Sequence, residues 1–458
     1  MPNSFIFDAN RCTGCGACRL ACSIENRLEP EQSWRRIDTF NRTRHPGVPL
    51  YHLSLACNHC AEPECMYACP ALAYTRNDAS GAVLLDESKC IGCRYCAWAC
   101  PYDAPVFVSQ RGVMTKCTFC HHRLQEGLKP ACAALCPTGA LDFADLPEAE
   151  LEYGIPGFPA TDLGPRLRVE PLDGSRRLPV MMAPEVAEPF VALAEAPTTE
   201  VTLKSEWTLM LFTFLTATLV AAVAATLSSA FSIRPIVFVD AAAVALALGS
   251  FHLGKVSRAY RAILNVRRSW LSREVATVSA FIALAVAYLW LAPGNRALGI
   301  VATLVGLLGL FCADRVYDVL GPSRPAFRHS ASVLWTGLFL AAVFAGSRVA
   351  VLFGVGKLAL YIHRKTEFAE TGRPLRPATS FARVAFGFAV PVGLWLVDPA
   401  ATRPLLIASV VLGELIDRGE YYTELERASP RRQMGIDLEE QVRAYTGAGR
   451  PLGVQAGD

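Results

Sequence analysis

Sixteen of the seventeen cysteines lie in the first 136 residues, and their spacing constrains the fold more than any other feature. Residues 90–100 hold four of them, at positions 90, 93, 96 and 100, followed by Pro101. Three further groups of four cysteines occur before and after this stretch. Cysteines repeated at such short intervals are typical of thiolate ligands to a metal centre rather than of a disulfide scaffold.

The spacing also indicates which metal centre is present. Two residues separate successive cysteines, three separate the last pair, and a proline follows, which is the ligand run of a [4Fe-4S] cluster whose fourth cysteine binds the neighbouring cluster. Zinc ribbons instead use cysteine pairs separated by a longer insert. The four groups are Cys12, Cys15, Cys18 and Cys22; Cys57, Cys60, Cys65 and Cys69; Cys90, Cys93, Cys96 and Cys100; and Cys117, Cys120, Cys132 and Cys136. They suffice for four clusters, and the sequence alone leaves open which groups pair.

Hydrophobicity divides the chain into unlike halves. The content of hydrophobic residues is 52%, high for a soluble protein, and the apolar runs are concentrated after residue 206. We predict an α+β double ferredoxin-like domain over 1–145, with short strands near 4–8 and 82–86 leading into cysteine loops. A Pro/Gly-rich linker over 146–205, a transmembrane region over 206–417 and a polar C-terminal tail over 418–458 complete the predicted domains.

Eight apolar stretches predict an all-α transmembrane bundle of about eight helices. They lie near 207–230, 236–252, 275–292, 297–313, 331–347, 349–362, 381–397 and 402–416. A membrane span needs about 17–25 residues, so the stretches near 349 and 402 qualify only if their helices extend into the flanks. The count is therefore eight, with seven as the alternative.

Charge asymmetry predicts the orientation of this bundle. With an even number of spans, the cysteine domain and the tail lie on one side, together with the cation-rich loops. These cations are Lys255, Arg258, Arg261, Arg267, Arg268, Arg273, Arg315, Arg324, Arg328, Arg364, Lys365, Arg373 and Arg376. The loops on the opposite side hold Arg234, Arg296, Arg348 and Arg403. The positive-inside rule places the cysteine domain in the cytoplasm, and the lack of a basic or long apolar segment in the first eight residues predicts no export signal.

With these four cysteine groups, the first 145 positions resemble the four-cluster iron–sulfur subunit of DMSO reductase and its relatives, which include nitrate reductase, polysulfide reductase and formate dehydrogenase. The resemblance implies that the outer groups pair with each other and the inner groups with each other. The implied ligand sets are Cys12, Cys15, Cys18 and Cys136; Cys22, Cys117, Cys120 and Cys132; Cys57, Cys60, Cys65 and Cys100; and Cys69, Cys90, Cys93 and Cys96. Some relatives have tryptophan at the position of Cys93 and hold a three-iron cluster there, so cysteine favours four [4Fe-4S] clusters.

Residues 251–254, Phe-His-Leu-Gly, and the loop up to Glu274 are similar to the second helix and following loop of the DMSO reductase membrane anchor. Gly413 and Glu414 near the last helix support this similarity. The chain therefore resembles two subunits joined into one. In that family the histidine of this motif lies near the menaquinol site, which makes His252 the candidate quinone residue. The family's anchor places this loop on the outer side of the membrane, so a periplasmic cysteine domain is the alternative orientation.

Physical reasoning supports the same histidine. Quinone chemistry moves protons together with electrons and needs a titratable group at the membrane edge, although a helix-capping or interfacial histidine would look the same in sequence. Asp240, Lys357 and Glu414 are ionisable residues within apolar spans, and we expect them either to form a proton path or to pair and snorkel. Lys116 and Arg94 could either tune cluster potentials or be solvated, and His59, His121 and His122 are expected to pack rather than to bind metal.

The sequence predicts an electron-transfer and membrane-anchor subunit of the cell inner membrane. It would exchange electrons between menaquinone or ubiquinone and a partner catalytic subunit, which by resemblance carries a molybdenum or tungsten bis-pterin guanine dinucleotide cofactor. No nucleotide-binding fingerprint and no basic, aromatic-rich patch for nucleic acid is found in the sequence. The alternative is a stand-alone quinol dehydrogenase module that reduces a diffusible carrier, and the direction of electron flow stays open.

Overall fold

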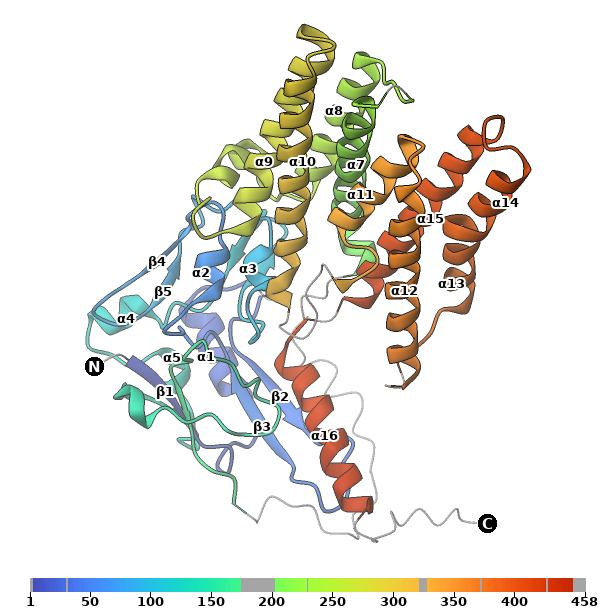
Figure 1. The fold of residues 1–458 in the computed structure, drawn as a ribbon. Coiled ribbons are helices and arrows are strands. Elements are labelled where there is room, and N and C mark those ends of the chain that lie inside the picture. Colours follow the sequence, from blue (N-terminus) through green and yellow to red (C-terminus); the bar gives the residue numbers. More distant parts are fainter. Residues whose placement is uncertain are drawn as a thin grey trace. The chain divides into compact units, whose positions relative to one another are not determined.

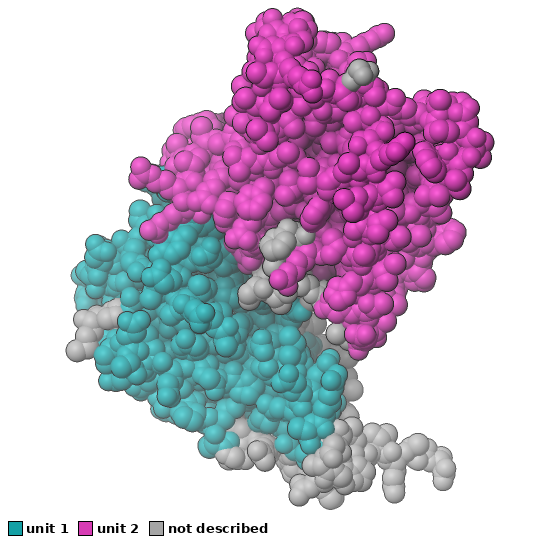
Figure 2. Space-filling model, in the orientation of Figure 1, with its two compact units in different colours: residues 1–199, 427–458 teal, residues 200–426 magenta. Residues whose placement is uncertain are grey.

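The chain forms two compact units in this computed structural model, which describes residues 3–29, 32–173, 202–228, 230–320, 328–370, 373–425 and 427–447. The first, here the cysteine unit, comprises residues 1–199 and 427–458, and the second, the helical unit, comprises residues 200–426 (Figure 2). Residues 174–201 of the predicted linker, Arg324, and residues 426 and 448–458 of the predicted tail lie outside the described residues. The domain boundaries given above stay predictions.

Short strands frame the cysteine loops of the first unit. They are β1 (Asn3–Phe7), β2 (Arg36–Phe40), β3 (Tyr51–Leu55), β4 (Tyr74–Arg76), β5 (Val83–Leu85), β6 (Val106–Val108), β7 (Val113–Thr115), β8 (Leu141–Asp145) and β9 (Leu167–Val169). β1 pairs antiparallel with β8, with Phe5 opposite Phe143, and parallel with β9. The strand that leads into the first cysteine group is thus bonded to the strand that leaves the fourth, which brings the outer groups together.

Each cysteine group carries a short helix. These are α1 (Ala17–Glu25), α2 (Glu64–Ala68), α3 (Tyr95–Trp98), α4 (His121–Gln125) and α5 (Ala131–Ala134), and a 3₁₀ turn, η1 (Glu148–Glu150), follows β8. Three hairpins, β2–β3, β4–β5 and β6–β7, connect the groups. The elements are shorter than the about 11 residues of an average helix, so loops shape much of the unit.

Aromatic rings and thiols share the core of this unit. Phe5, Phe119 and Phe143 meet edge to face, with ring centroids 5.1–5.3 Å apart. Cysteines from all four groups lie in the same buried cluster, including Cys12, Cys57 and others. Because thiols occupy positions that aliphatic side chains would otherwise fill, the stability of the core depends on what those thiols bind.

A C-terminal helix, α16 (Pro430–Gly447), belongs to the cysteine unit and lies beside β2 in Figure 1. Met434 on its inner face is buried in the core described above. Arg431 Nε donates to Asp38 Oδ1 at 3.0 Å, and the backbone N–H of Gly157 donates to Asp437 Oδ2 at 2.5 Å. The last helix of the chain therefore completes the unit that the first residues begin.

The helical unit consists of helices in all eight apolar stretches. They are α7 (Leu203–Thr226), α8 (Pro235–Phe251), η3 (Val256–Ile263), α9 (Trp270–Val286), η4 (Ala287–Leu291), α10 (Arg296–Val316), η5 (Tyr317–Leu320), α11 (Val333–Phe344), α12 (Val349–Glu370), α13 (Pro377–Val384), η7 (Ala385–Ala389), α14 (Val390–Val397) and α15 (Arg403–Glu424). α7 packs against α8, α10, α11 and α15 (Figure 1). A Cβ on Gly306 of α10 would come within 2.8 Å of Val220 on α7, so glycine permits this close approach.

Not every helix has the length and composition of a span. Among the described residues, four segments do, namely Leu203–Thr226, Trp270–Leu291, Arg296–Leu320 and Pro377–Val397. A fifth results if α8 and η3, bent by 101°, are counted as one. α12 and α15 extend well past their apolar stretches, each to 22 residues, and carry charges there. Arg364 and Lys365, expected in a loop, lie instead inside α12.

Candidate functional site

The cysteine loops curl because several of their residues have left-handed backbone conformations. Gly92, between Cys90 and Cys93, has φ +69°, and Arg94, which precedes α3, has φ +61°. Cys120, which precedes α4, has φ +48°. Such turns direct successive thiols, and backbone N–H groups with them, toward one interior space.

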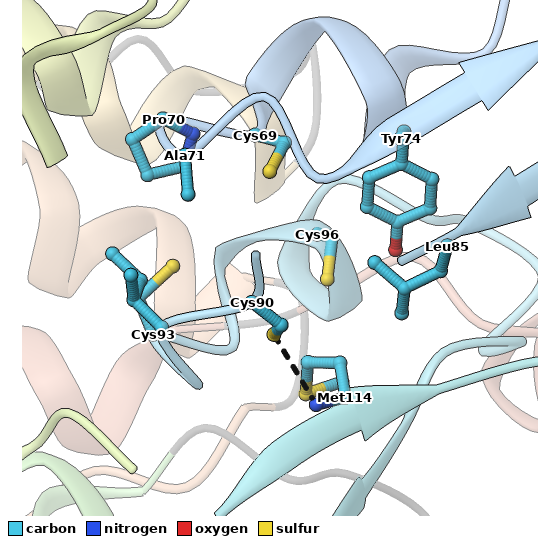
Figure 3. Close-up of a pocket in the computed structure, with 10 residues that line it drawn as sticks. Cys69, Pro70, Ala71, Tyr74, Leu85, Cys90, Cys93, Cys96 and Met114 are labelled. Carbon is cyan, nitrogen blue, oxygen red and sulfur yellow. Dashed lines mark hydrogen bonds between the residues drawn. The ribbon is translucent and has the colours of Figure 1, made fainter. Parts of the chain in front are cut away.

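Four thiols line one pocket and are here called site 4: Cys69, Cys90, Cys93 and Cys96. Figure 3 shows the sulfurs of Cys69, Cys93 and Cys96 turned toward the space between them, with Tyr74 at its edge. The Cys90 sulfur accepts backbone N–H bonds from Gly92 and Met114, both at 3.4 Å. Backbone donors of this kind favour the thiolate form that a metal requires.

A second pocket defines site 1, which is lined by Cys12, Cys15, Cys18 and Cys136. The Cys136 sulfur accepts a 3.4 Å bond from the backbone N–H of Leu141 at the start of β8. The Cys18 sulfur lies 3.3 Å from Ser54 Oγ. Thiols from the first and last cysteine groups thus share one cavity, as the pairing of β1 with β8 requires.

The other eight thiols form two further neighbourhoods, site 2 with Cys22, Cys117, Cys120 and Cys132, and site 3 with Cys57, Cys60, Cys65 and Cys100. At site 2, Asn26 Nδ2 lies 3.8 Å from the Cys22 sulfur and 3.7 Å from the Cys120 sulfur. At site 3, burial raises the pKa of Cys100 to about 11, and the thiolate of Cys57 adds to this rise. The division of sites 2 and 3 follows the family resemblance, and the assignment of the four sets to four clusters stays a prediction.

Burial governs the charge of these thiols. It raises the pKa of Cys12 to about 11 and the pKa of Cys22 to about 12, and neighbouring thiolates add to both rises. Burial therefore favours the protonated thiol at these two positions, and a bound iron–sulfur cluster would supply the positive charge that holds the thiolate. Among the described residues, no three His, Cys, Asp or Glu side chains converge on a single metal ion.

Buried donors around the thiols fit negatively charged clusters. Nε and Nη2 of Arg35 and Nε2 of His59 are buried, and none of these atoms has a hydrogen-bond acceptor among the described residues. Lys116 is 2% exposed, and its Nζ lies 3.4 Å from the Cys57 sulfur. Lys116 thus faces a thiol and is not solvated, which sequence reasoning had left open, whereas Arg94 lies over the ring of Phe107 at 4.2 Å.

Two of the histidines beside the cysteines, His59 and His122, lie where packing or surface contacts account for them. Nδ1 of His59 accepts the backbone N–H of Val83 at 2.9 Å, and its ring lies 3.6 Å from that of Phe119. Burial and then the nearby cations lower the pKa of His59, so the ring is neutral. His122 is half exposed, and its Nε2 lies 2.8 Å from Glu25.

In the helical unit, His252 is the C-cap residue of α8, immediately before the backbone bends into η3. Its side chain is half-buried. The bend, the cap position and partial exposure give the imidazole a place at the end of an apolar helix, which is the position expected from the sequence. Asp240, on the same helix, is exposed and makes no ion pair with a described residue.

Lys357 and Glu414, expected to form a proton path or to pair, contact each other. Lys357 Nζ lies 2.8 Å from Glu414 Oε2 and donates to Thr336 Oγ1 at 3.1 Å. Both charged side chains are 1% exposed or less. Asp240 is not part of this contact, so the structure brings two of the three candidates together.

A larger network of buried charges surrounds this pair, and sequence reasoning missed it. Glu414 also binds Arg383 at 2.7 Å, and Arg364 reaches Asp417 at 3.3 Å. Arg364 further pairs with Glu420, and Lys365 with Glu420 and Glu424. The signal was a helical period: the buried residues of α12 include Lys357, Tyr361, Arg364 and Phe368, which lie on one face.

Comparison with known proteins agrees with both halves. Residues 48–146 match the family of 4Fe-4S dicluster domains, and residues 202–365 match the DMSO reductase anchor subunit family (DmsC). One polypeptide of the anaerobic dimethyl sulfoxide reductase of Haemophilus influenzae is 44% identical over an alignment of 181 residues, which covers 36% of this chain and 88% of that polypeptide.

Two further relatives match the same part of the chain. The corresponding polypeptide of the anaerobic dimethyl sulfoxide reductase of Escherichia coli K12 is 44% identical, over 33% of this chain and 77% of its own length. A subunit of the sulfite dehydrogenase of Allochromatium vinosum is 34% identical, over 33% and 72%. The chain therefore belongs to the family of DMSO reductase iron–sulfur subunits, and it joins a ferredoxin-like 4Fe-4S region to a DMSO reductase-type membrane anchor in one polypeptide.

Proposed function

We propose that this chain exchanges electrons between the quinone pool and a partner molybdopterin catalytic subunit through four [4Fe-4S] clusters. The observation that carries the proposal is the convergence of two sets of four thiols, at sites 1 and 4, within a unit that the same chain fuses to an anchor. Bound clusters would supply four one-electron carriers in a double ferredoxin-like arrangement. The chain's thiolates hold them, and its buried core excludes water from them.

His252 is the proposed quinone residue. Quinol oxidation releases protons as well as electrons, and an imidazole nitrogen at a helix end can accept one. Its C-cap position, partial burial and the 101° bend that follows support this role. Lys357 and Glu414 are proposed as proton carriers on the strength of their direct contact, and Asp240 in the same role without such a contact.

We propose that the helical unit crosses the inner membrane an even number of times, with eight helices. Residues before and after the bundle belong to the same cysteine unit, through the contacts of α16, so the chain must enter and leave on one side. The cation-rich segment 255–273 then supports a cytoplasmic cysteine unit. Protease cleavage of this segment in sealed vesicles tests it, and cleavage from the periplasmic side alone would reverse the orientation.

Purification in mild detergent tests the whole proposal. We expect about sixteen irons per chain, reduction of the clusters by a quinol analogue, and a co-purifying catalytic chain with stoichiometric molybdenum or tungsten. Far fewer irons, or no exchange with the quinol, would contradict the proposal. Clusters that accept electrons from quinol without any bound catalytic chain would favour the stand-alone module that reduces a diffusible carrier.

A further inference from the structure

Arg35 is a buried cation that has no carboxylate partner among the described residues. It is 2% exposed and directly precedes β2. Nη1 donates to Ser54 O at 3.1 Å and to Ser54 Oγ at 3.0 Å, and the guanidinium lies over the Phe5 ring at 4.5 Å. Nε and Nη2 have no acceptor among the described residues. A buried charge in this state is costly unless something else balances it.

The groups that face Arg35 are thiols of two different sites. Cys18 belongs to site 1, while Cys22, Cys117 and Cys132 belong to site 2. Negative charge on these four sulfurs would be stabilised by the nearby guanidinium. Ser54 adds a direct link, because its hydroxyl contacts both Arg35 and the Cys18 sulfur. Arg35 therefore lies at the junction of sites 1 and 2.

Lys116 occupies the next junction in the same manner. It is 2% exposed, and its Nζ contacts the Cys57 sulfur of site 3 at 3.4 Å. The same Nζ donates to the carbonyl oxygen of Cys117, a site 2 residue, at 2.9 Å, and to Val83 O. The described residues offer it no ion pair with a carboxylate. Lys116 and Arg35 are thus two unneutralised buried cations, each between two neighbouring thiol sets.

We propose that Arg35 and Lys116 are fixed countercharges that raise the reduction potentials of the clusters on either side of them, Arg35 at sites 1 and 2 and Lys116 at sites 2 and 3. The proposal rests on the proposed function, because it presupposes that the four sites hold clusters. Reduction adds a negative charge, and a cation in a buried, low-dielectric junction stabilises that charge more than a solvated cation does. Because each cation lies between two sites, the reduction potentials of neighbouring clusters rise together, and no large difference in potential arises between them.

Substitutions that change charge but not position test this inference. Arg35→Gln and Lys116→Met remove the cations, and Arg35→Lys and Lys116→Arg keep them. Lys129→Met is the matched control, since Lys129 lies in the same cysteine group but is half exposed and paired with Asp142. The full-length protein with its clusters is reduced stepwise, and each cluster is followed by electron paramagnetic resonance, with iron counted in every sample.

We expect Arg35→Gln to lower the reduction potentials at sites 1 and 2, and Lys116→Met those at sites 2 and 3. Each shift should be at least about 59 mV, which corresponds to a tenfold change in the one-electron equilibrium constant. Site 4 and the charge-retaining and Lys129→Met variants should stay near the parent values. Potentials unchanged in both neutral variants would overturn the inference.

Iron retention provides a second readout if the neutral variants assemble poorly. Loss of iron from Arg35→Gln and Lys116→Met, but not from Arg35→Lys and Lys116→Arg, supports the countercharge role. Loss from both kinds of variant shows that the shape of the side chain matters rather than its charge, and contradicts the inference. Absence of clusters from the parent protein would instead refute the proposed function, so the two failures are distinguishable.

Discussion

Two buried cations of the cysteine unit and two of the helical unit are balanced in different ways. In the cysteine unit, Arg35 and Lys116 are buried among sulfurs, and the described residues provide no carboxylate for them. In the helical unit, Lys357 and Arg383 are at least as deeply buried, but each binds Glu414 directly. Lys357 and Arg383 are therefore neutralised within the helical unit, whereas Arg35 and Lys116 depend on something that the cysteine unit binds. The difference predicts that the two units respond differently to loss of metal and to loss of a single carboxylate.

Iron removal should produce the largest difference between the two units. Chelation under mildly acidic or oxidising conditions would leave the sixteen thiols without iron and the two cations without a compensating negative charge. We therefore expect the cysteine unit to unfold, because structural metals supply folding free energy. The helical unit, whose ion pairs are internal, should keep its helices. Limited proteolysis and far-ultraviolet circular dichroism in detergent measure this. Equal loss of structure in both units would show that the helical unit also depends on the clusters.

His252→Ala tests the proposed quinone site of the helical unit. Removal of the imidazole at the end of α8 should abolish cluster reduction by a quinol analogue, because no group at this position would then accept the proton. The cluster signals themselves should persist when a chemical reductant is used. Ser250→Ala is the control, since its hydroxyl only bonds back to Leu246 O at 2.8 Å. Parent-like turnover of His252→Ala would remove the quinone assignment.

Glu414→Ala tests whether the helical unit truly neutralises itself. It takes away the carboxylate that binds Lys357 and Arg383, and breaking a buried pair in this way costs about 3–5 kcal/mol. Thermal unfolding of the bundle in detergent measures the loss. The double variant Glu414→Leu with Lys357→Met should recover part of it, because it removes the unpaired charge as well. Asp240→Asn, at an exposed position without an ion pair, should leave the unfolding temperature unchanged.

The smallest effect is expected at an exposed pair of the cysteine unit. Arg111 Nη1 and Glu87 Oε2 lie 2.6 Å apart, but both side chains are more than a third exposed. Arg111→Ala should cost less than about 1 kcal/mol, and added salt should reduce even that. A loss of stability as large as that of Glu414→Ala would mean that burial does not determine how much an ion pair stabilises this protein.

Much of the cysteine unit follows from the sequence, since ligand spacing is a local property. The strands near Phe5 and Val83 and the metal-binding loops could be predicted because turns, thiols and prolines recur at fixed intervals. The junction roles of Arg35 and Lys116 could not, because the contacts of Arg35 with Ser54 and of Lys116 with Cys57 join residues that are 19 and 59 positions apart. Only the folded protein places these side chains against the thiols.

The buried charges of the helical unit were missed for a different reason. Hydropathy marks where an apolar stretch ends, and the stretch near 349 ends before Arg364, although the helix continues to Glu370. A charged residue past that point looks like part of a loop. Its partners, Asp417 and Glu420, lie on another helix more than 50 residues away, so pairing is invisible until the two helices are packed together.

The contacts of α16 have a consequence for how the protein is made. Met434 completes a core whose other residues come from the first 170 positions, yet the ribosome synthesises it only after the entire bundle. The core of the cysteine unit is therefore completed only after all residues of the helical unit have been synthesised, so a chain that stops within the bundle would leave this core open at the place of Met434.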